Sequence, residues 1–380
     1  MADLVLVTGG AGFIGSALVR KLVARGCDVR VLDSLSSQIH GANASPPAWF
    51  ADSGVEFMLG SVTDRATWEK ALDGVRAVAH LAAETGTGQS MYEIERYNAV
   101  NSHGTALMLD VLAHQQSRSV TRIVLTSSRS VYGEGRYECR SCGSGPAFPG
   151  ARSADALAAG QWDHRCEACG HAMTAVPTRE NDPLQPASIY AATKLAQEQL
   201  VTIGASAMSI NHLIFRLQNV YGEGQSLNNP YTGILSIFTT KLRRGSHLPL
   251  FEDGEESRDF VHVEDVAETL ARATLAANLP DVIVNVGAGV GTSVRNVAAA
   301  LSDCVGVTHD LRVTGEYRLG DIRHNFADIG KLEAIFDYRP TVSLAEGLGR
   351  LVTWALSEPL PEDTVDKANA ELRERGMMAS

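Results

Sequence analysis

Tyr190 and Lys194 are four positions apart in the sequence Ser188-Ile-Tyr-Ala-Ala-Thr-Lys194. Because residues four apart lie on one face of a helix, both side chains can reach the same ligand. A tyrosine ordinarily has a pKa of about 10, so its use as a base near neutral pH requires about 4 kcal/mol of phenolate stabilisation. The Lys194 ammonium can provide part of it. The same pair also arises by chance in amphipathic helices, so other residues must decide its role.

A glycine-rich segment, Thr8-Gly-Gly-Ala-Gly-Phe-Ile-Gly15, follows the first apolar run and opens a helical pattern. Glycine allows a tight turn and close approach to a pyrophosphate, and a helix N-terminus offers free N–H groups. Asp33 ends the second apolar run, where a carboxylate accepts hydrogen bonds from ribose hydroxyls and repels a 2′-phosphate. A glycine cluster alone would indicate only a turn, but this context predicts a tightly bound NAD.

The elements that must position these residues alternate between short apolar runs and helical patterns, which is typical of βαβ units and a parallel sheet. We expect helices at Ser102–Ala113 and Ala191–Ile203. The expected strands are Leu4–Val7, Val29–Leu32, Val55–Leu59, Ala77–Leu81, Arg122–Ser127 and His212–Leu217.

The expected fold is α/β, with a doubly wound parallel Rossmann sheet in residues 1–217 and a smaller, mixed substrate-binding domain in residues 218–380. Residues 258–271 are expected to return to the first domain, and residues 136–178 form an insertion that resembles a zinc ribbon. We expect the polar tail after Pro359 to be mobile, with a short helix near Val365–Arg375.

The net charge of −11 over 380 residues argues against nucleic acid and anionic lipid as partners. No window approaches the roughly 20 apolar residues that span a membrane. The N-terminus lacks the basic segment of a signal peptide, so we expect a cytoplasmic protein.

The glycine spacing, the sequence His80-Leu-Ala-Ala83 and Asn101 together resemble the extended short-chain dehydrogenase/reductase family. One departure is Ser61, where relatives carry an acidic residue that contacts adenine. The resemblance implies a set of cofactor contacts from Gly9, Gly12, Phe13, Ile14, Gly15, Asp33, Ala82, Asn101, Tyr190 and Lys194.

The segment Thr126-Ser-Ser-Arg-Ser-Val-Tyr-Gly133 resembles the one that carries the family's catalytic serine, which would be Ser128. The structural alternative is a serine that caps a loop. Family members that remove water from the sugar carry Asp and Glu where this chain has Arg129 and Ser130. No cysteine of the kind used by enolising epimerases lies between Ser128 and Tyr132. The resemblance therefore implies hydride chemistry at a sugar hydroxyl, catalysed by Ser128, Tyr190 and Lys194.

Three segments of the second half resemble the family's substrate-binding landmarks, although each arginine alone could be a surface ion-pair partner. Asn219 belongs to Arg216-Leu-Gln-Asn-Val-Tyr-Gly222, and Arg258 and Arg318 open the other two segments. The two arginines would hold a pyrophosphate by charge-assisted hydrogen bonds. The implied ligand is a nucleotide-diphosphate sugar, contacted by Gln89, Ser90, Ser128, Asn219, Arg258 and Arg318.

The insertion carries two Cys-x-x-Cys pairs, formed by Cys139 with Cys142 and by Cys166 with Cys169. Four thiolates close a tetrahedral site, which predicts structural rather than catalytic zinc. The alternatives are cysteines without metal and a disulfide, which fits a cytosolic protein poorly. His164 and His171 lie close enough in sequence to replace a thiolate.

The insertion and its flanking segments resemble the bacterial dTDP-L-rhamnose 4-epimerase group, which implies a homodimeric nucleotide-sugar 4-epimerase. The helices expected at Ser102–Ala113 and Ala191–Ile203 would form the dimer contact. Two alternatives stay open: a one-way reductase or dehydrogenase of nucleotide sugars, and a non-catalytic NAD-sensing adaptor with a zinc ribbon.

Overall fold

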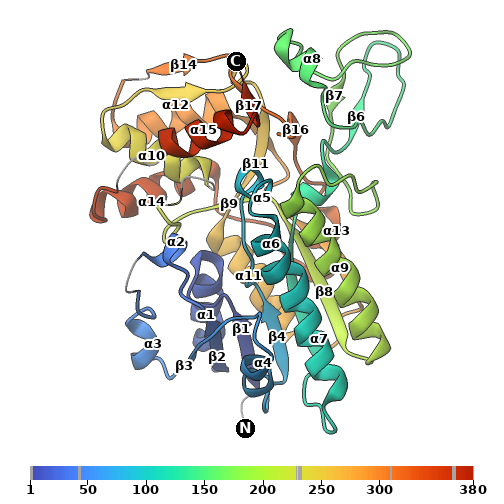
Figure 1. Ribbon diagram of the computed structural model, residues 1–380, viewed down its shortest axis with the longest axis vertical. Helices are drawn as coiled ribbons and strands as arrows, with labels where there is room; N and C mark the ends of the chain where they lie inside the picture. The colour runs from blue at the N-terminus through green and yellow to red at the C-terminus, as the bar shows by residue number, and fades with distance from the viewer. Residues whose placement is uncertain are drawn as a thin grey trace.

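The computed structural model describes residues 3–41, 44–227, 229, 233–308, 310–361 and 365–379. Its centre is a seven-stranded parallel sheet in the order β12-β8-β5-β4-β1-β2-β3 (Figure 1). The strands are β1 (Leu4–Thr8), β2 (Asp28–Asp33), β3 (Glu56–Leu59), β4 (Ala77–His80), β5 (Arg122–Ser128), β8 (Asn211–Leu217) and β12 (Val282–Val286). The six predicted strands are confirmed, and β12 is the strand that the sequence analysis did not include.

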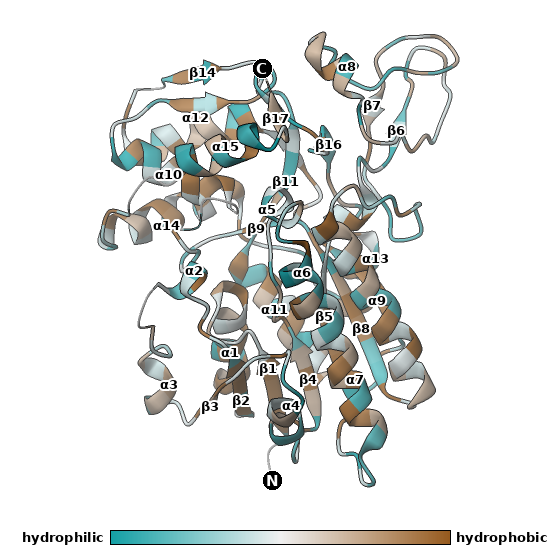
Figure 2. Ribbon diagram, in the orientation of Figure 1, coloured by the Kyte–Doolittle hydropathy of each residue, from teal (hydrophilic) through white to brown (hydrophobic). Residues whose placement is uncertain are grey.

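Alternation along the strands produces two apolar layers, one on each face of the sheet. In β1, Val5 and Val7 point to one face, whereas Leu6 points to the other. Figure 2 shows these central strands in brown. The first face is covered by α1 (Phe13–Ala24), α11 (Val263–Leu275) and α13 (Gly330–Phe336), and the second by α4 (Arg65–Ala71), α7 (Gly104–His114) and α9 (Ile189–Ala207).

The sheet is therefore completed by the second half of the chain. Strand β12 pairs with β8 in parallel, and α11 packs against α1. The part of the second half that returns to the Rossmann sheet is therefore longer than the expected residues 258–271. The predicted domain boundary at residue 217 stays a prediction. Short elements connect the sheet to its helices: α2 (Ser37–His40), α3 (Trp49–Asp52), α5 (Thr87–Ser90), α6 (Ile94–Tyr97), the π-helix η1 (Asn98–His103) and the 3₁₀ helix η2 (Arg129–Tyr132).

A second core lies between three helices of the C-terminal half. Leu235, Leu301 and Leu348 are buried there, one from each helix. The helices are α10 (Ile234–Arg243), α12 (Val294–Val305) and α14 (Leu344–Ser357). Besides β12, this half contains the strands β9 (Asn219–Tyr221), β10 (Leu248–Leu250), β11 (Ser257–His262), β13 (Gly291–Ser293), β14 (Leu311–Val313), β15 (Tyr317–Arg318) and β16 (His324–Asn325), and a short strand of the tail described below.

The insertion projects from the body beside the C-terminal half (Figure 1). It contains α8 (Ala154–Ala158) and a two-stranded antiparallel pair of β6 (Tyr137–Glu138) and β7 (Thr174–Ala175). So short a pair is marginal alone. The insertion therefore depends on other contacts for its stability.

The predicted helix of the tail is confirmed as α15 (Val365–Glu374), but the expectation that the tail is mobile is wrong for residues 365–379. Ala368 and Leu372 of α15 are buried, and β17 (Met378–Ala379) pairs with β15. Polar composition misled the prediction, because two apolar side chains and one strand pairing are enough to dock this short segment.

Candidate active site

A cleft of about 570 Å³ runs along the carboxyl ends of β1, β2, β4, β5 and β8. Ligands bind at this edge in open parallel sheets. Most of the predicted site residues line it. They are Gly9, Gly12, Phe13, Ile14, Gly15, Asp33, Ala82, Ser128, Tyr190, Lys194 and Asn219.

The glycine loop leaves no room for larger residues. A Cβ on Gly15 would lie 2.1 Å from the carbonyl oxygen of Gly9, and Gly9 itself has a φ of +68°. Gly12 caps α1 without any side-chain acceptor, and no acidic residue occupies the first turn. The free N–H groups and the positive end of the helix dipole therefore face the cleft, which fits the pyrophosphate of NAD.

Asp33 is 8% exposed at the end of β2 and is fixed by backbone donors. Its Oδ2 accepts a hydrogen bond from the Ala11 N–H at 3.0 Å, and its Oδ1 accepts one from the Leu35 N–H at 2.9 Å. A carboxylate has about four acceptor positions, so capacity is left for two ribose hydroxyls. The carboxylate and the glycine loop together fit the adenosine half of NAD.

Tyr190 enters the cleft from the first turn of α9, whose N-cap residue is Ser188. The Ser188 hydroxyl accepts a hydrogen bond from the Ala191 N–H and so fixes the start of the helix. Burial raises the pKa of Tyr190, whereas a hydrogen bond with Ser128 and the charge of Arg129 lower it. The Tyr97 ring lies edge-on at 6.4 Å. The Tyr190 phenol thus lies partly buried in the cleft, and its pKa responds to a neighbouring hydroxyl and a cation.

Ser128 combines the two roles considered from the sequence. Its Oγ accepts a hydrogen bond from the Ser130 N–H at 3.2 Å, so it caps η2. It also lines the cleft, and it lowers the pKa of Tyr190. The cap fixes the hydroxyl beside the tyrosine.

Lys194 lies about one helical turn after Tyr190 on α9 and is 3% exposed. Its Nζ donates to the Thr126 carbonyl at 2.8 Å and to Gln197 Oε1 at 2.9 Å. An ammonium has three donors, so one stays available for a ligand. Burial lowers the pKa of Lys194 to about 7. The lysine is therefore oriented by a carbonyl and an amide rather than by a carboxylate.

The sequence analysis missed the hydrogen-bonded network behind Lys194. Gln197 Nε2 donates to Thr105 Oγ1 at 2.8 Å, and Thr105 Oγ1 lies 3.0 Å from His80 Nε2. His80 is fully buried, and burial lowers its pKa to about 3, so the ring is neutral. The spacing of Lys194 and Gln197 on one helix face is the only sequence signal for this network.

Three predicted residues support the cleft from behind it instead of lining it. Asn101 is fully buried in η1. Its Oδ1 accepts from the Glu84 N–H, and its Nδ2 donates to Thr193 of α9. Ser90 Oγ accepts from the Tyr190 N–H at 3.1 Å, and Gln89 bonds to Gln38. These side chains hold the helices that present the cleft residues.

The two predicted substrate arginines also lie outside the cleft lining. Arg258 Nη2 is 3.3 Å from Asp321 Oδ1, and Asp321 does line the cleft. Arg318 Nη2 donates to Asn369 of α15 at 2.8 Å, while its buried Nε has no partner among the described residues. The docked tail therefore holds Arg318 in place, a contact that no local sequence signal indicates.

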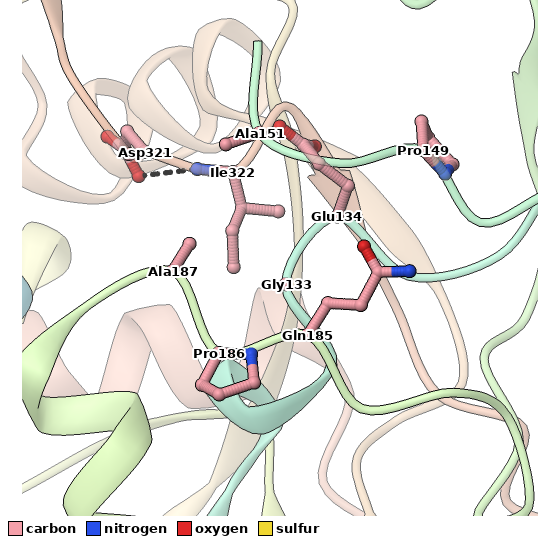
Figure 3. A pocket seen from close by; sticks show the side chains of 10 residues that line it. Gly133, Glu134, Pro149, Ala151, Gln185, Pro186, Ala187, Asp321 and Ile322 are labelled. Carbon is pink, nitrogen blue, oxygen red and sulfur yellow. Dashed lines mark hydrogen bonds between the residues drawn. The ribbon is translucent and has the colours of Figure 1, made fainter.

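A side pocket of about 220 Å³ adjoins the cleft, with which it shares Ala187, Gly320, Asp321 and Ile322. Figure 3 shows it between the segment preceding α9 and the loop that carries Asp321 and Ile322. Pro149 and Ala151 of the insertion complete the lining. The insertion thus forms part of the wall beside the cleft.

Two ion pairs join the insertion to the C-terminal half, and a third contact joins it to Glu134, just before the insertion. Arg152 Nη1 lies 2.8 Å from Glu252 Oε2, and Arg323, 2% exposed, lies 2.9 Å from Asp163 Oδ1. His164 Nε2 is 3.3 Å from Glu134 Oε2. The charges of Arg152 and Glu252 are both buried and are stable only when they are paired, so this pair fixes one orientation of the insertion.

The four cysteines of the insertion converge, with all four sulfur atoms within 4.8 Å of one another. Sγ of Cys139 and Cys169 are 3.5 Å apart, and those of Cys142 and Cys166 are 3.7 Å apart. Four thiolates around one zinc at about 2.3 Å would stand about 3.8 Å apart in a tetrahedron. The sulfur atoms therefore fit a single tetrahedral ion and are too far apart for disulfides.

The two Cys-x-x-Cys pairs form the same turn twice. The N–H of Gly143 bonds to the Cys139 carbonyl at 2.9 Å, and that of Gly170 bonds to the Cys166 carbonyl at 2.8 Å. Both glycines have positive φ, +71° and +74°. Each pair is thus a tight loop that holds its two cysteines close together.

Comparison with known families identifies the chain. A model described as "NAD dependent epimerase/dehydratase family" matches residues 5–154 and 166–299. The chain belongs to this family. Residues 155–165, between the two matched segments, lie inside the cysteine insertion, and membership confirms the predictions of an α/β enzyme that uses NAD.

Two curated relatives extend over nearly the whole chain. A dTDP-L-rhamnose 4-epimerase from Burkholderia thailandensis is 40% identical over 93% of this chain and 95% of its own length. A UDP-glucose 4-epimerase from Mycolicibacterium smegmatis is 31% identical over 91% of this chain and 96% of its own.

Solved structures agree with the fold. A UDP-glucose 4-epimerase from Thermotoga maritima, with UDP-glucose, has a TM-score of 0.74 and 27% identity over 93% of this chain and 98% of its own. The enzyme of the same name from Thermus thermophilus, in complex with NAD, has a TM-score of 0.71 and 27% identity over 94% of this chain and 100% of its own. Among the described residues, no helix is both long and apolar enough to cross a membrane.

Proposed function

We propose that this protein is an NAD-dependent 4-epimerase of a nucleotide-linked sugar, acting on a dTDP-6-deoxyhexose of the dTDP-L-rhamnose and dTDP-6-deoxy-L-talose type. The observation that carries the proposal is the placement of Ser128, Tyr190 and Lys194 in the cleft that also contains the glycine loop. The 40% identity to a dTDP-L-rhamnose 4-epimerase supports the choice of substrate.

Each of the three side chains has a distinct task. Tyr190, as the phenolate, takes the proton of the sugar C4 hydroxyl, while Ser128 hydrogen-bonds to the same oxygen. Lys194 directs its remaining N–H toward the ligand. NAD, when bound, supplies a reversible hydride acceptor. Inversion requires the 4-keto sugar to turn over in the cleft, after which Tyr190 returns the proton to the oxygen in its new configuration.

The residues after Ser128 separate epimerisation from dehydration. Removal of water from the sugar requires an acid and a base that face C5 and C6, and the corresponding positions hold Arg129 and Ser130. Neither side chain is a carboxylate. Tyr190 remains as the proton-transfer group beside Ser128, which suffices for oxidation and re-reduction at one carbon.

The phosphates of the substrate are assigned to Asn219, Arg258 and Arg318. Asn219 lines the cleft, Arg258 reaches it through Asp321, and Arg318 has an unpartnered buried Nε. Local cations of this kind are needed because the chain as a whole carries a charge of −11. Gln89 and Ser90 act on the sugar end indirectly, through Tyr97 and Tyr190.

We assign one structural zinc ion to Cys139, Cys142, Cys166 and Cys169. The support is the convergence of the four sulfur atoms and the repeated turn around each pair. The small apolar content of the insertion cannot stabilise it, so metal binding would provide folding free energy. Metal analysis of protein purified without chelator should find one zinc per chain, and its absence would contradict the assignment.

We also propose a cytoplasmic homodimer in which α7 and α9 form the contact. These helices pack side by side at one edge of the molecule (Figure 1), and Ile203 of α9 is 71% exposed. Because Ile203 is exposed, a substitution there would perturb a contact made by α9 without disturbing the core. Sedimentation analysis of the wild type and of Ile203→Lys tests the contact, and a monomeric wild type would contradict it.

The function is tested by incubating the purified protein with dTDP-L-rhamnose and following both product and cofactor. We expect inversion at C4, seen by proton NMR, without net change in the absorbance of added NADH at 340 nm. Stoichiometric consumption of NADH or NAD would establish the one-way reductase or dehydrogenase. No turnover of any dTDP-, UDP- or GDP-sugar would favour the non-catalytic adaptor.

A further inference from the structure

The tail segment of residues 365–379, which we call the strap, has a buried face with one polar member. Within α15 the buried side chains are Ala368, Asn369 and Leu372. The two apolar side chains stabilise the docked helix by burial alone. A buried amide is costly unless it is hydrogen-bonded, so the partner of Asn369 indicates why a polar residue lies on this face.

The strap holds residues 316–319 of the substrate-binding half one after another. Arg373 Nη2 lies 2.6 Å from Glu316 Oε1. The pairing of β17 with β15, together with a bond from the next N–H to the Met377 carbonyl, holds the following three residues, which are Tyr317, Arg318 and Leu319. Residues 320–322 come directly after them and line the cleft. The strap therefore fixes the segment that leads into the substrate end of the cleft.

Arg318 receives a neutral partner from the strap. Its Nη2 donates to Asn369 Oδ1 at 2.8 Å, and its Cζ lies 4.8 Å from the centroid of the Phe251 ring. Its buried Nε has no hydrogen-bond partner among the described residues. By contrast, the nearby Arg258 lies 3.3 Å from the Asp321 carboxylate. An amide oxygen orients a guanidinium without neutralising it, so the charge and the Nε donor of Arg318 stay available to an anionic ligand.

The opposite side of the strap contacts the Rossmann half. A Cβ on Gly88 of α5 would lie 3.4 Å from Leu372 Cδ1, which is ordinary packing distance. The Tyr92 hydroxyl donates to Glu371 Oε2 at 3.4 Å, and Arg375 Cζ lies 4.3 Å from the centroid of the Tyr92 ring. The position of Asn369 is therefore defined from both halves of the molecule, and it is a fixed point for the arginine.

We propose that Asn369 is a positioning residue for substrate binding: it holds the Arg318 guanidinium, with its charge uncompensated, where the diphosphate of the nucleotide sugar binds. The inference rests on the proposed function, which assigns the substrate phosphates in part to this arginine. A carboxylate in place of the amide would still accept the hydrogen bond, but it would compete with the phosphates for the same cation. NAD binds at the glycine loop and does not depend on this contact.

The test is the dissociation constant of dTDP, measured by isothermal titration calorimetry for the wild type, Asn369→Ala and Asn369→Asp. Loss of a hydrogen bond to a charged group should weaken the binding of dTDP by Asn369→Ala about tenfold. Asn369→Asp keeps an acceptor, so its thermal stability should equal or exceed that of the wild type, yet it too should bind dTDP more weakly. In both variants the KM for dTDP-L-rhamnose should rise, whereas kcat and NAD content should stay near the wild-type values.

Ala370→Asp is the matched control, because it adds the same charge at the next, exposed position of α15. Wild-type affinity for dTDP in Asn369→Ala overturns the inference. So does wild-type affinity in Asn369→Asp, since the residue would then only dock the strap, and so does an equal loss of NAD and dTDP binding. A wild type that binds neither dTDP nor UDP contradicts the proposed function as well, whereas undiminished binding by the variants contradicts this inference alone.

Discussion

The two ends of the cleft are lined by different kinds of groups. The cofactor end consists of backbone: the glycine loop, the uncapped start of α1 and one carboxylate held by the N–H groups of Ala11 and Leu35. The substrate end includes charged side chains from distant segments, among them Arg129, Arg258 and Asp321, with the insertion beside them. The cofactor end is one short segment of backbone in which few substitutions are tolerated. The substrate end depends instead on contacts between side chains that are far apart in the sequence.

The largest effect on turnover is expected from a substitution of Tyr190, where the two ends of the cleft meet. Tyr190→Phe removes the hydroxyl that exchanges the proton but leaves both ends intact, so turnover should fall by at least about 10²-fold. NAD content and thermal stability should equal those of the wild type. Near-normal turnover in steady-state assays would show that another group is the base.

The cofactor end is tested by Gly15→Ala, which places a methyl group where a Cβ lies 2.1 Å from the Gly9 carbonyl. Because the clash is with backbone, the loop must shift, and the NAD content of the purified protein should fall to below about a tenth of the wild-type value. Gly349→Ala is the control, since nothing lies within 4 Å of that Cβ. Full NAD content in Gly15→Ala would contradict the backbone account of this end.

The substrate end is tested by Arg152→Met, which leaves Glu252 and Glu134 buried without this partner. Removal of one member of a buried ion pair typically costs about 3 kcal/mol, measured here as the change in the free energy of unfolding in urea. Arg140→Met, on the exposed surface of the insertion, should change it little. Equal stabilities of the two variants would show that the ion pairs do not fasten the insertion.

A smaller and more selective effect is expected from Cys142→Ser. Loss of one thiolate should release zinc and loosen the insertion that lines the side pocket, raising the KM for the nucleotide sugar several-fold. NAD binding at the other end should stay unchanged in fluorescence titration. Cys304→Ser, a change of a solitary exposed cysteine, is the matched control. Unaltered kinetics in zinc-free Cys142→Ser would separate the insertion from substrate binding.

The difference between the cofactor end and the substrate end also explains which parts of the site could be predicted from the sequence. The glycine loop, Asp33 and the pair of Tyr190 and Lys194 are local patterns, so their placement in one cleft follows from the strand order. Asn101 was expected to touch the cofactor, yet it binds Thr193 of α9, because a long-range hydrogen bond leaves no mark in local spacing. Arg318 likewise meets a tail residue 51 positions away. For residues held by distant partners, the sequence indicated which residues matter but not which residues they contact.

The central claim is that one site removes the C4 hydrogen of the sugar and returns it to the opposite face. The most direct measurement uses dTDP-L-rhamnose labelled with deuterium at C4, in ordinary water and with no added NADH. The account predicts that the epimeric product retains the label at C4, as seen by mass spectrometry and the missing H4 signal in the NMR spectrum. Replacement of the label by solvent hydrogen would contradict it.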